Sequence, residues 1–269
     1  MITESIEEAH LLDNGNLIIG DFEMYRSQFD FRGKNNILFC DGTVFQDSYL
    51  RFGGDNSVVF FEKNKYVLKI EAKIGFDSTI YFGKDNFINK KIILRAAERK
   101  NIIIGNDCLF SFNVYLYTAD PHLLYDFSGR RINQSKNILI GDHVWIGQNS
   151  LILKGTQLGS GSVVGGNSVI TSGPKKSNCV YAGNPGKKVK SDIYFLDIAS
   201  INFDADRVSR FEQDSKEGTK KFIFSNDRKT VCIDSIHKML INAEGSQDRL
   251  DKVKKHLSDY QWKNRFFIG

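Results

Sequence analysis

The amino-acid sequence predicts a mainly β fold in which short strands are joined by tight turns. Between residues 140 and 171 an aliphatic residue returns at every sixth position, and glycine follows four of these residues. A helix repeats at about 3.6 residues and a strand at about 2. A period of six fits short strands and turns instead, since glycine permits backbone angles that other residues avoid. The repeated positions are Ile140, Ile146, Ile152, Leu158, Val164 and Ile170.

The same period continues upstream with less regularity. Ile104, Phe110 and Leu116 keep the phase of the later repeat. Residues 16–67 contain apolar runs separated by turn residues, but their spacing drifts, so we expect irregular early coils there. Residues 1–15 are expected to cover one end of the stack, because unpaired strand edges need protection.

The repeat stops near residue 190, and a different pattern follows. Leu250, Val253 and Leu257 stand at helical spacing in the segment beyond it. The sequence therefore predicts two parts, a repeat domain of residues 1–190 and a separate mixed α/β appendage of residues 191–269.

Composition limits the class of protein. The chain has 269 residues, of which 41% are hydrophobic and 26% charged, and no apolar run approaches the roughly 18 residues of a membrane span. We therefore expect a cytoplasmic protein without a membrane span. The net charge of +5 is compatible with anionic ligands but does not indicate a nucleic-acid partner. Four cysteines without CxxC spacing favour buried, reduced thiols over disulfides or a zinc site.

One segment interrupts the repeat without ending it. Residues 117–137 contain turn formers and charges but no aliphatic period, which predicts a loop extruded from one coil. Loops on rigid scaffolds commonly carry function, and this loop contains His122. Histidine is suited to taking a proton from a hydroxyl near neutral pH, so His122 is the candidate general base. Asp120 is either its orienting partner or an ordinary turn residue.

The loop and the block after it carry a resemblance to a known family. The motif consists of Asp120-x-His122, Tyr125, Gly129, Arg131-Ile132-Asn133 and KxIxIGDHVWIG from Lys136 to Gly147. It closely resembles the bacterial cell-surface sugar O-acetyltransferases of the hexapeptide-repeat family, which include polysialic-acid capsule O-acetyltransferases and galactoside and maltose acetyltransferases. The resemblance covers about residues 100–190 and implies a left-handed parallel β-helix with an extruded catalytic loop. Many relatives have proline after the histidine, whereas here Pro121 precedes it and Leu123 follows.

Trp145 lies in the block directly after the loop. Because the repeated aliphatics fill the narrow interior, its indole should face outward as a flat apolar wall with one N–H donor. The resemblance implies that Trp145 lines the acetyl and acceptor site, and contact between subunits is the alternative. His143 is a candidate to meet the cofactor, although a surface or interface position is the simpler expectation. Backbone N–H groups near Gly147 and Gln148 are candidate donors to a thioester oxyanion.

The end of the repeat indicates the cofactor. Residues 174–191 contain five lysines and no acid. The segment VYAGNPGKKV resembles the family's closing motif VxAGxPAKxV, with Gly186 in place of alanine. The resemblance implies acetyl-CoA as donor, with its phosphates near lysines and its pantetheine arm on glycine turns. The candidate cofactor-binding residues are Gly147, Gln148, Gly165, Gly166, Ala182, Gly183, Pro185, Lys187 and Lys188.

The acceptor is expected to be a sugar or polysaccharide. Arg130 and Arg131 are suited to pairing with a carboxylate such as that of sialic acid, and Tyr125 to stacking on a sugar ring. Tyr115, Tyr117 and Phe127 are further aromatic candidates near the loop. An acidic polysaccharide is therefore our hypothesis for the acceptor.

The resemblance also implies a homotrimer with a site at each of three interfaces, where His122 faces Trp145 and the lysine-rich ending across the interface.

Three alternatives stay open at this point. The first is another acceptor class on the same fold, a nucleotide-sugar N-acetyltransferase or a serine O-acetyltransferase. The second is a metal site like that of γ-carbonic anhydrases, which needs gathered histidines whose H-x4-H spacing is absent here, so no metal is expected. The third is a non-catalytic scaffold.

Overall fold

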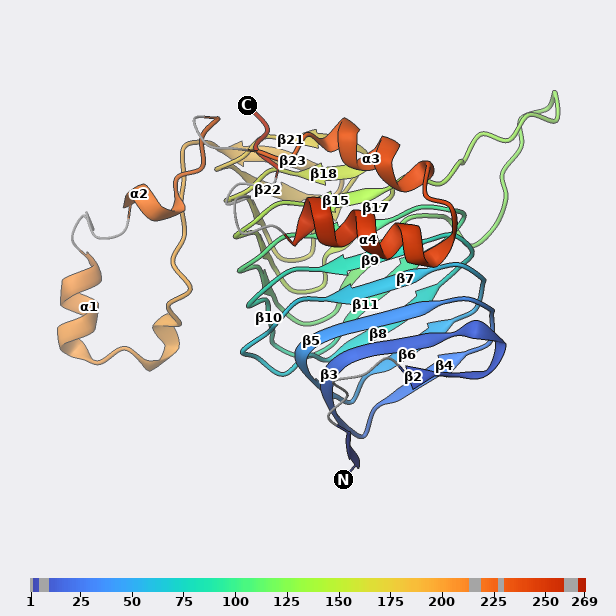
Figure 1. The fold of residues 1–269 in the computed structure, drawn as a ribbon. Helices are drawn as coiled ribbons and strands as arrows, with labels where there is room; N and C mark the ends of the chain where they lie inside the picture. The colour runs from blue at the N-terminus through green and yellow to red at the C-terminus, as the bar shows by residue number, and fades with distance from the viewer. Residues whose placement is uncertain (1, 5–9, 213–218, 227–229, 259–265) are drawn as a thin grey trace.

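The computed structural model describes residues 2–4, 10–212, 219–226, 230–258 and 266–269. In these residues the chain winds into a parallel β-solenoid whose three sheets we call A, B and C, with the two termini at opposite ends (Figure 1). Sheet A contains β1 (Ile2–Glu4), β3 (Leu17–Tyr25), β5 (Ile37–Gln46), β7 (Val58–Phe61), β9 (Thr79–Phe82), β12 (Ile102–Ile104), β15 (Ile138–Ile140), β18 (Thr156–Leu158) and β21 (Gly173–Lys175), with β2 (His10–Leu11) beside β3.

The other two sheets complete each coil. Sheet B contains β4 (Gln28–Phe31), β6 (Tyr49–Phe52), β8 (Ile70–Ile74), β11 (Ile92–Ala96), β14 (Val114–Tyr117), β17 (Leu151–Leu153) and β20 (Val169–Ile170). Sheet C contains β10 (Phe87–Ile88), β13 (Leu109–Phe110), β16 (Trp145–Ile146), β19 (Val163–Val164), β22 (Val180–Gly183) and β23 (Gly186–Lys190). From β9 onward the chain passes from sheet A to C to B before it begins the next coil, whereas the earlier coils have strands in sheets A and B only.

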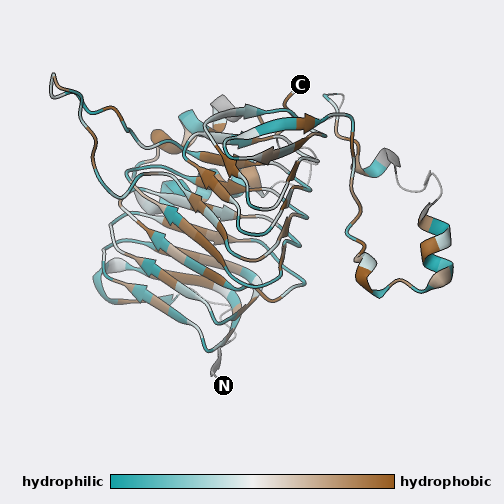
Figure 2. Ribbon diagram, turned by 180° about the vertical axis from the view of Figure 1, so that it is seen from behind, coloured by the Kyte–Doolittle hydropathy of each residue, from teal (hydrophilic) through white to brown (hydrophobic). Residues whose placement is uncertain are grey.

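The period of six is the spacing of the three sides of one coil. Ile140, Ile146 and Ile152 belong to sheets A, C and B, and each pairs with the residue 18 positions later: Leu158, Val164 and Ile170. All six side chains are buried at 1% exposure or less and stack along the interior. Hydrophobic residues accordingly recur in rows along the solenoid (Figure 2).

The early coils are longer, which explains the drifting spacing. Leu17 pairs with Ile37, 20 residues on, and Ile80 pairs with Ile102, 22 residues on. The additional residues lie mainly in the turns, and one lies in an irregularity between β3 and β5, where the register shifts between Gly20 and Phe22. The N-terminal segments 2–4 and 10–11 pair with β3 in antiparallel fashion, and the other residues of the expected end cover, 1 and 5–9, lie outside the described residues.

Glycine is needed after the repeated aliphatic residues for a different reason from the one expected. Gly141 and Gly147 do not adopt left-handed backbone angles. Instead the next coil passes so close that a Cβ on Gly147 would lie 2.6 Å from the backbone nitrogen of Gly166. The left-handed positions are taken by residues such as Asn149 (φ 55°) and Asn167 (φ 57°), whose side-chain amides bond to each other from coil to coil.

The C-terminal segment is partly a layer of the main body. Its described elements are η2 (Ser200–Asn202), α1 (Ala205–Glu212), α2 (Thr219–Phe222), α3 (Ile233–Ile241) and α4 (Gly245–Leu257). Among the described residues of this segment Thr230 forms an isolated β-bridge, and no longer strand is present. Helices α3 and α4 cover sheet A, whereas α1 stands away from the solenoid (Figure 1). None of the described helices is both long and apolar enough to cross a membrane.

Helix α4 packs on sheet A because its apolar stripe meets outward-facing residues of that sheet. Leu250, Val253 and Leu257 are at most 1% exposed and belong to one apolar cluster with Tyr81 and Ile103. The Tyr81 hydroxyl also donates a hydrogen bond of 3.0 Å to the Leu257 carbonyl oxygen.

Three cysteines, at positions 40, 108 and 179, are buried free thiols as expected, but Cys232 is exposed.

We expect Leu250→Ala to lower the free energy of unfolding by about 2–5 kcal/mol, because truncation leaves a cavity between α4 and sheet A. The matched exposed change Lys255→Ala should alter it by less than about 0.5 kcal/mol. Denaturant titration of both variants measures the difference. Equal stability of the two would mean that α4 is not an integral layer.

Candidate active site

The loop of residues 118–137 leaves the end of β14 in sheet B and returns at β15 in sheet A, where it projects far from the corner (Figure 1). Its two arms are joined by hydrogen bonds. The Ile132 N–H donates to the Leu124 carbonyl oxygen at 3.0 Å, and the Leu124 N–H donates to Asn133 Oδ1 at 2.9 Å. The loop is therefore an ordered two-armed projection.

Asp120 anchors the loop to the next coil. Its Oδ2 accepts a bond of 2.5 Å from Lys154 Nζ and one of 2.9 Å from Asn133 Nδ2. The hydrogen bond from Lys154 lowers the pKa of the Asp120 carboxyl, and the bond from Asn133 acts in the same direction. Since the pKa is lowered in the folded state, this anchor stabilises the loop above the ordinary aspartate pKa. The stabilisation is lost as the pH falls through the lowered value.

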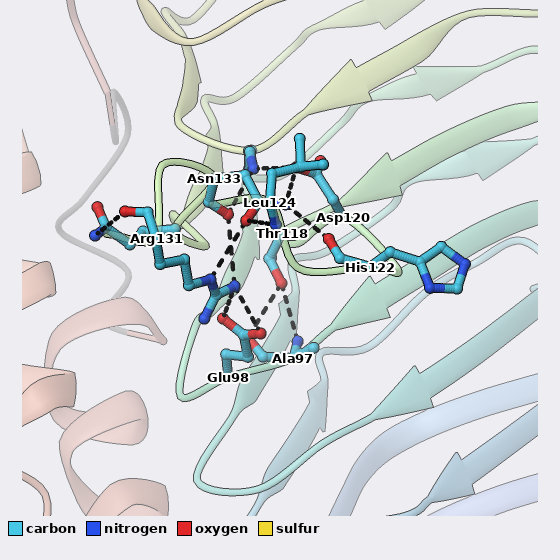
Figure 3. Close-up of polar contacts among 10 residues, drawn as sticks. Ala97, Glu98, Thr118, Asp120, His122, Leu124, Arg131 and Asn133 are labelled. Carbon is cyan, nitrogen blue, oxygen red and sulfur yellow. Dashed lines mark hydrogen bonds and ion pairs between the residues drawn. The ribbon is translucent and has the colours of Figure 1, made fainter. Parts of the chain in front are cut away.

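The structure does not show the expected pairing of Asp120 with the His122 ring. Asn133 Nδ2 instead donates 2.7 Å to the His122 carbonyl oxygen, so Asp120 acts on the His122 backbone through Asn133. Figure 3 shows the imidazole pointing away from Asp120 and Asn133. His122 is exposed, and no hydrogen bond reaches its ring from the residues that the structure describes. The His122 backbone is held in place, while its imidazole ring remains available to a ligand.

The loop's other substrate-binding candidates divide into two groups. Arg131 is occupied, because its guanidinium donates to both carboxylate oxygens of Glu98 at 2.9 and 2.8 Å and ties the loop to the preceding coil (Figure 3). Arg130 keeps 80% of its side chain exposed while it pairs with Asp126 at the tip. Tyr125 is 56% exposed. Arg130 and Tyr125 are therefore accessible to a ligand, and Arg131 has a structural contact.

Trp145 faces outward from sheet C, as expected, with 42% exposure. It lines a cleft of about 380 Å³ together with Phe87 and Leu109 of the same sheet. The opposite wall is the extended segment from Leu196 to Ala199, which begins the C-terminal part of the chain. The cleft is thus an apolar groove between the solenoid and its own C-terminal segment.

His143 holds that segment in place and is not on the surface. It is 2% exposed, and its ring stacks on Phe195 at 4.0 Å and on Phe222 at 4.3 Å. Nδ1 lies 2.8 Å from Asp107 Oδ2, and Nε2 lies 3.0 Å from the Phe195 carbonyl oxygen. Within this chain the His143 ring is therefore fully engaged by structural contacts.

The glycines predicted to receive the cofactor form one column at the corner between sheets C and B. The Gly147 N–H bonds to the Val164 carbonyl oxygen, and the Gly165 N–H to that of Tyr181, so these turns stack directly on each other. Gly165 also faces the small side chain of Ala182 in the last coil. Gln148 and Gly166 are exposed beside this column. Gly147 itself is buried and Gly165 half-buried, so an extended ligand can reach the backbone at the exposed positions Gln148 and Gly166.

The last predicted cofactor residues lie in the hairpin of β22 and β23. Gly183 (φ 98°) and Pro185 are exposed in its turn, and Lys187 and Lys188 are exposed on β23. A Cβ on Gly186 would collide with the buried side chain of Ile170, which explains why glycine replaces the motif's alanine.

The predicted residues do not all meet in one place. The His122 loop lies at the corner between sheets B and A, whereas Trp145 lies on sheet C. Figures 1 and 2 both show the loop and the C-terminal segment beside Trp145 projecting from opposite sides of the solenoid. The predicted site residues thus fall into two groups on different sides of one chain.

Sequence reasoning missed two residues that position His122. Lys154 comes from the coil after the loop and carries no local signal, since a lysine in a turn is ordinarily solvated. Asn133 was visible only as part of the Arg-Ile-Asn motif. The described residues contain no group of three or more His, Cys, Asp or Glu side chains arranged to hold a metal ion.

The geometry defines a class, a parallel β-solenoid with an anchored histidine loop, and comparison with known proteins agrees. The model of the bacterial transferase hexapeptide family (six repeats) matches residues 137–172. A putative lipopolysaccharide biosynthesis O-acetyl transferase, WbbJ of Escherichia coli K12, is 31% identical over 53% of this chain and 74% of its own length. The chain belongs to this bacterial hexapeptide-repeat transferase family.

Two further relatives refine the likeness. The polysialic acid O-acetyltransferase of Escherichia coli O1:K1 is 33% identical over 52% of this chain, which spans about half, 48%, of that relative. The crystal structure of the polySia-specific acetyltransferase NeuO superposes with a TM-score of 0.62 at 29% identity. That superposition covers 74% of this chain and 94% of NeuO.

We expect Lys154→Met to lower turnover by up to about a hundredfold, because the anchor of the His122 backbone is lost and small displacements of a catalytic group are costly. Lys154→Arg should restore part of the rate. Lys63→Met, an exposed lysine away from the loop, serves as control. A Lys154→Met protein with normal kcat would show that the anchor does not position His122.

Proposed function

We propose that this protein is an O-acetyltransferase that moves an acetyl group from acetyl-CoA to a hydroxyl of a bacterial surface or capsular sugar, in the cytoplasm. The observation that carries the proposal is the His122 loop, whose backbone is fixed through Asn133 while the imidazole stays free. A base that must accept a proton from a bound hydroxyl needs this combination of fixed position and open nitrogen.

His122 has two tasks in this reaction. Its imidazole accepts the proton of the acceptor hydroxyl as that oxygen attacks the thioester carbonyl carbon. The imidazolium then gives the proton to the leaving sulfur when the carbon–sulfur bond breaks, so the ring returns to its starting state. Asp120 supports both steps indirectly, by holding the loop with Lys154 and Asn133.

The donor is supported by the corner between sheets C and B. Gln148 and Gly166 are exposed and Gly165 and Ala182 half-buried along a column that leads to the closing hairpin, so the backbone is accessible there. Lys187 and Lys188 stand exposed at its end, where they suit the phosphates of CoA. The Gly147 N–H is bonded to the Val164 carbonyl oxygen, so of the two predicted donors the Gln148 N–H is the candidate to stabilise the developing oxyanion.

A complete site requires a second copy of the chain. His122 and Trp145 lie on different sides of the solenoid, and sheet A is already covered by α3 and α4. The later coils, which carry the His122 loop and the Trp145 cleft, are the part of sheets B and C left for contact between copies. A closed homotrimer, in which each His122 loop reaches the Trp145 cleft and lysine ending of its neighbour, satisfies this geometry.

An acidic sugar is the acceptor class that the loop supports. Arg130 is exposed at the tip and suited to a carboxylate, and Tyr125 is exposed beside it. The names of the relatives, polysialic acid and lipopolysaccharide transferases, agree with a surface polysaccharide. Release of CoA in the presence of capsular glycans, nucleotide sugars or serine separates this class from the two alternatives on the same fold.

We expect His122→Ala to lower kcat by about two to four orders of magnitude, the usual contribution of a positioned general base. CoA affinity and the thermal midpoint should stay near those of the unmodified protein, because the ring makes no described contact. Steady-state kinetics with a polysialic acid acceptor measure the loss. Near-normal turnover would refute the mechanism.

We expect inactive His122→Ala and inactive Lys188→Glu subunits to recover activity when they are mixed and reassembled, because some interfaces then carry both intact groups. Light scattering and an activity assay on the mixture measure this. A fully active monomer would contradict the composite site. A proven trimer without recovery would mean that each site takes both residues from one chain.

A further inference from the structure

The outer face of sheet B carries a cationic ladder, by which we mean Arg51, Lys73 and Arg95. These residues lie directly opposite one another on β6, β8 and β11. Neighbouring strands of a sheet are about 4.8 Å apart, so the three side chains leave the surface at successive steps along the solenoid axis. In each strand these residues alternate with buried ones, so their side chains point outward. Lys73 is exposed, and the two arginines are half-buried.

The ladder borders a groove of about 390 Å³. Arg32 joins the three cations at its edge, and the floor is made of small residues, among them Gly53, Gly75 and Ala97. No carboxylate is among the lining residues of this groove. A shallow channel with a narrow floor and cationic walls suits an extended, negatively charged chain better than a compact ligand.

The charges of the ladder are only partly compensated. Asp30 lies 3.0 Å from Arg32 Nε and 3.2 Å from Arg51 Nε, and Glu71 accepts a 2.6 Å bond from Arg95. The Arg51 Nε contact lacks hydrogen-bond geometry, so that buried nitrogen is left without a hydrogen bond. Among the described residues no carboxylate pairs with Lys73. Four cations thus face two carboxylates, and the groove keeps a positive balance.

The ladder leads to the loop that carries His122. Arg95 lies opposite Tyr117, the last residue before the loop, and Tyr117 meets Tyr115 edge to face at 6.0 Å. The first loop residue, Thr118, accepts a 2.9 Å bond from the Ala97 N–H at the groove floor. The cations, the two tyrosines and the loop base therefore form one continuous path on the surface.

We propose that this path binds the chain of an acidic polysaccharide and delivers its residues to the His122 loop. This inference rests on the proposed function and adds a binding track outside the reacting site. Carboxylates of the polymer pair with the ladder, and its hydroxyls donate to Asp30 and Glu71, which have acceptor capacity left. The same two carboxylates repel closely spaced phosphates, which favours a polysaccharide over a nucleic acid.

The test compares Lys73→Glu with Lys255→Glu, which makes the same charge change on the exposed surface of α4. Binding of long-chain polysialic acid to the protein without acetyl-CoA is titrated at low salt. Lys73→Glu should weaken it about fivefold, the effect of one exposed ion pair, and added salt should reduce the difference. Lys255→Glu should bind like the unmodified protein.

Transfer assays then separate the track from the reaction. With Lys73→Glu the loss of kcat/KM should be about fivefold greater for long-chain polysialic acid than for free sialic acid.

Equal losses on both acceptors, together with unchanged polymer binding, would overturn the track while the transferase function stands. No transfer by the unmodified protein would refute the proposed function, and the binding titration would still decide on the track. Equal competition by single-stranded DNA at the same charge concentration would overturn the assignment to a polysaccharide.

Discussion

The in-register stacking of each coil on the next is the constraint on which the rest of this molecule depends. The inner strands of each sheet pair with strands of the coils on both sides, and the interior aliphatic residues form one continuous core cluster. A strand that slipped by one residue would turn its buried residues outward. Long insertions are therefore expected in turns. The largest one shows this: Ile102 pairs with Ile138, 36 residues on, without loss of register.

This rigidity explains how an exposed loop can hold the backbone of the candidate base, His122, in place. The loop itself has no core, so its order comes from contacts with coils on either side. Lys154 reaches Asp120 and the Asn133 carbonyl oxygen from the following coil, and Glu98 holds Arg131 from the preceding one. The contacts fix backbone and leave the His122 ring unbonded, which is the arrangement that a group for proton transfer requires.

The C-terminal segment determines which faces of the solenoid are open. Helices α3 and α4 cover sheet A with an apolar layer, and residues 195–199 cross sheet C, where His143 is enclosed between Phe195 and Phe222. The early part of sheet B has no such cover among the described residues, and several of its outward positions are charged, among them Arg51, Lys73 and Arg95. The same chain thus builds an apolar cleft on one side and a cationic groove on another.

The sequence by itself determined the period, the place of the loop and the candidate base. A repeat of six is legible because each side of a coil faces the same environment, so Ile140 and its successors are selected for the same interior. The outward position of Trp145 follows from the same pattern. The loop at 118–137 was predictable because it lacks this pattern, and His122 because its neighbours resemble a known motif.

Only the tertiary structure decided the partners of the polar residues. Asp120 is two positions from His122 in sequence but binds Lys154, 34 residues away, because the next coil passes beneath the loop. His143 was expected at the surface and is buried, because a segment some 50 residues later folds over it. The lengths of the early coils and the docking of α4 likewise depend on contacts between distant segments. Local periodicity reports the environment of a position, whereas a side chain's partner is set by whichever coil or helix the stack brings beside it.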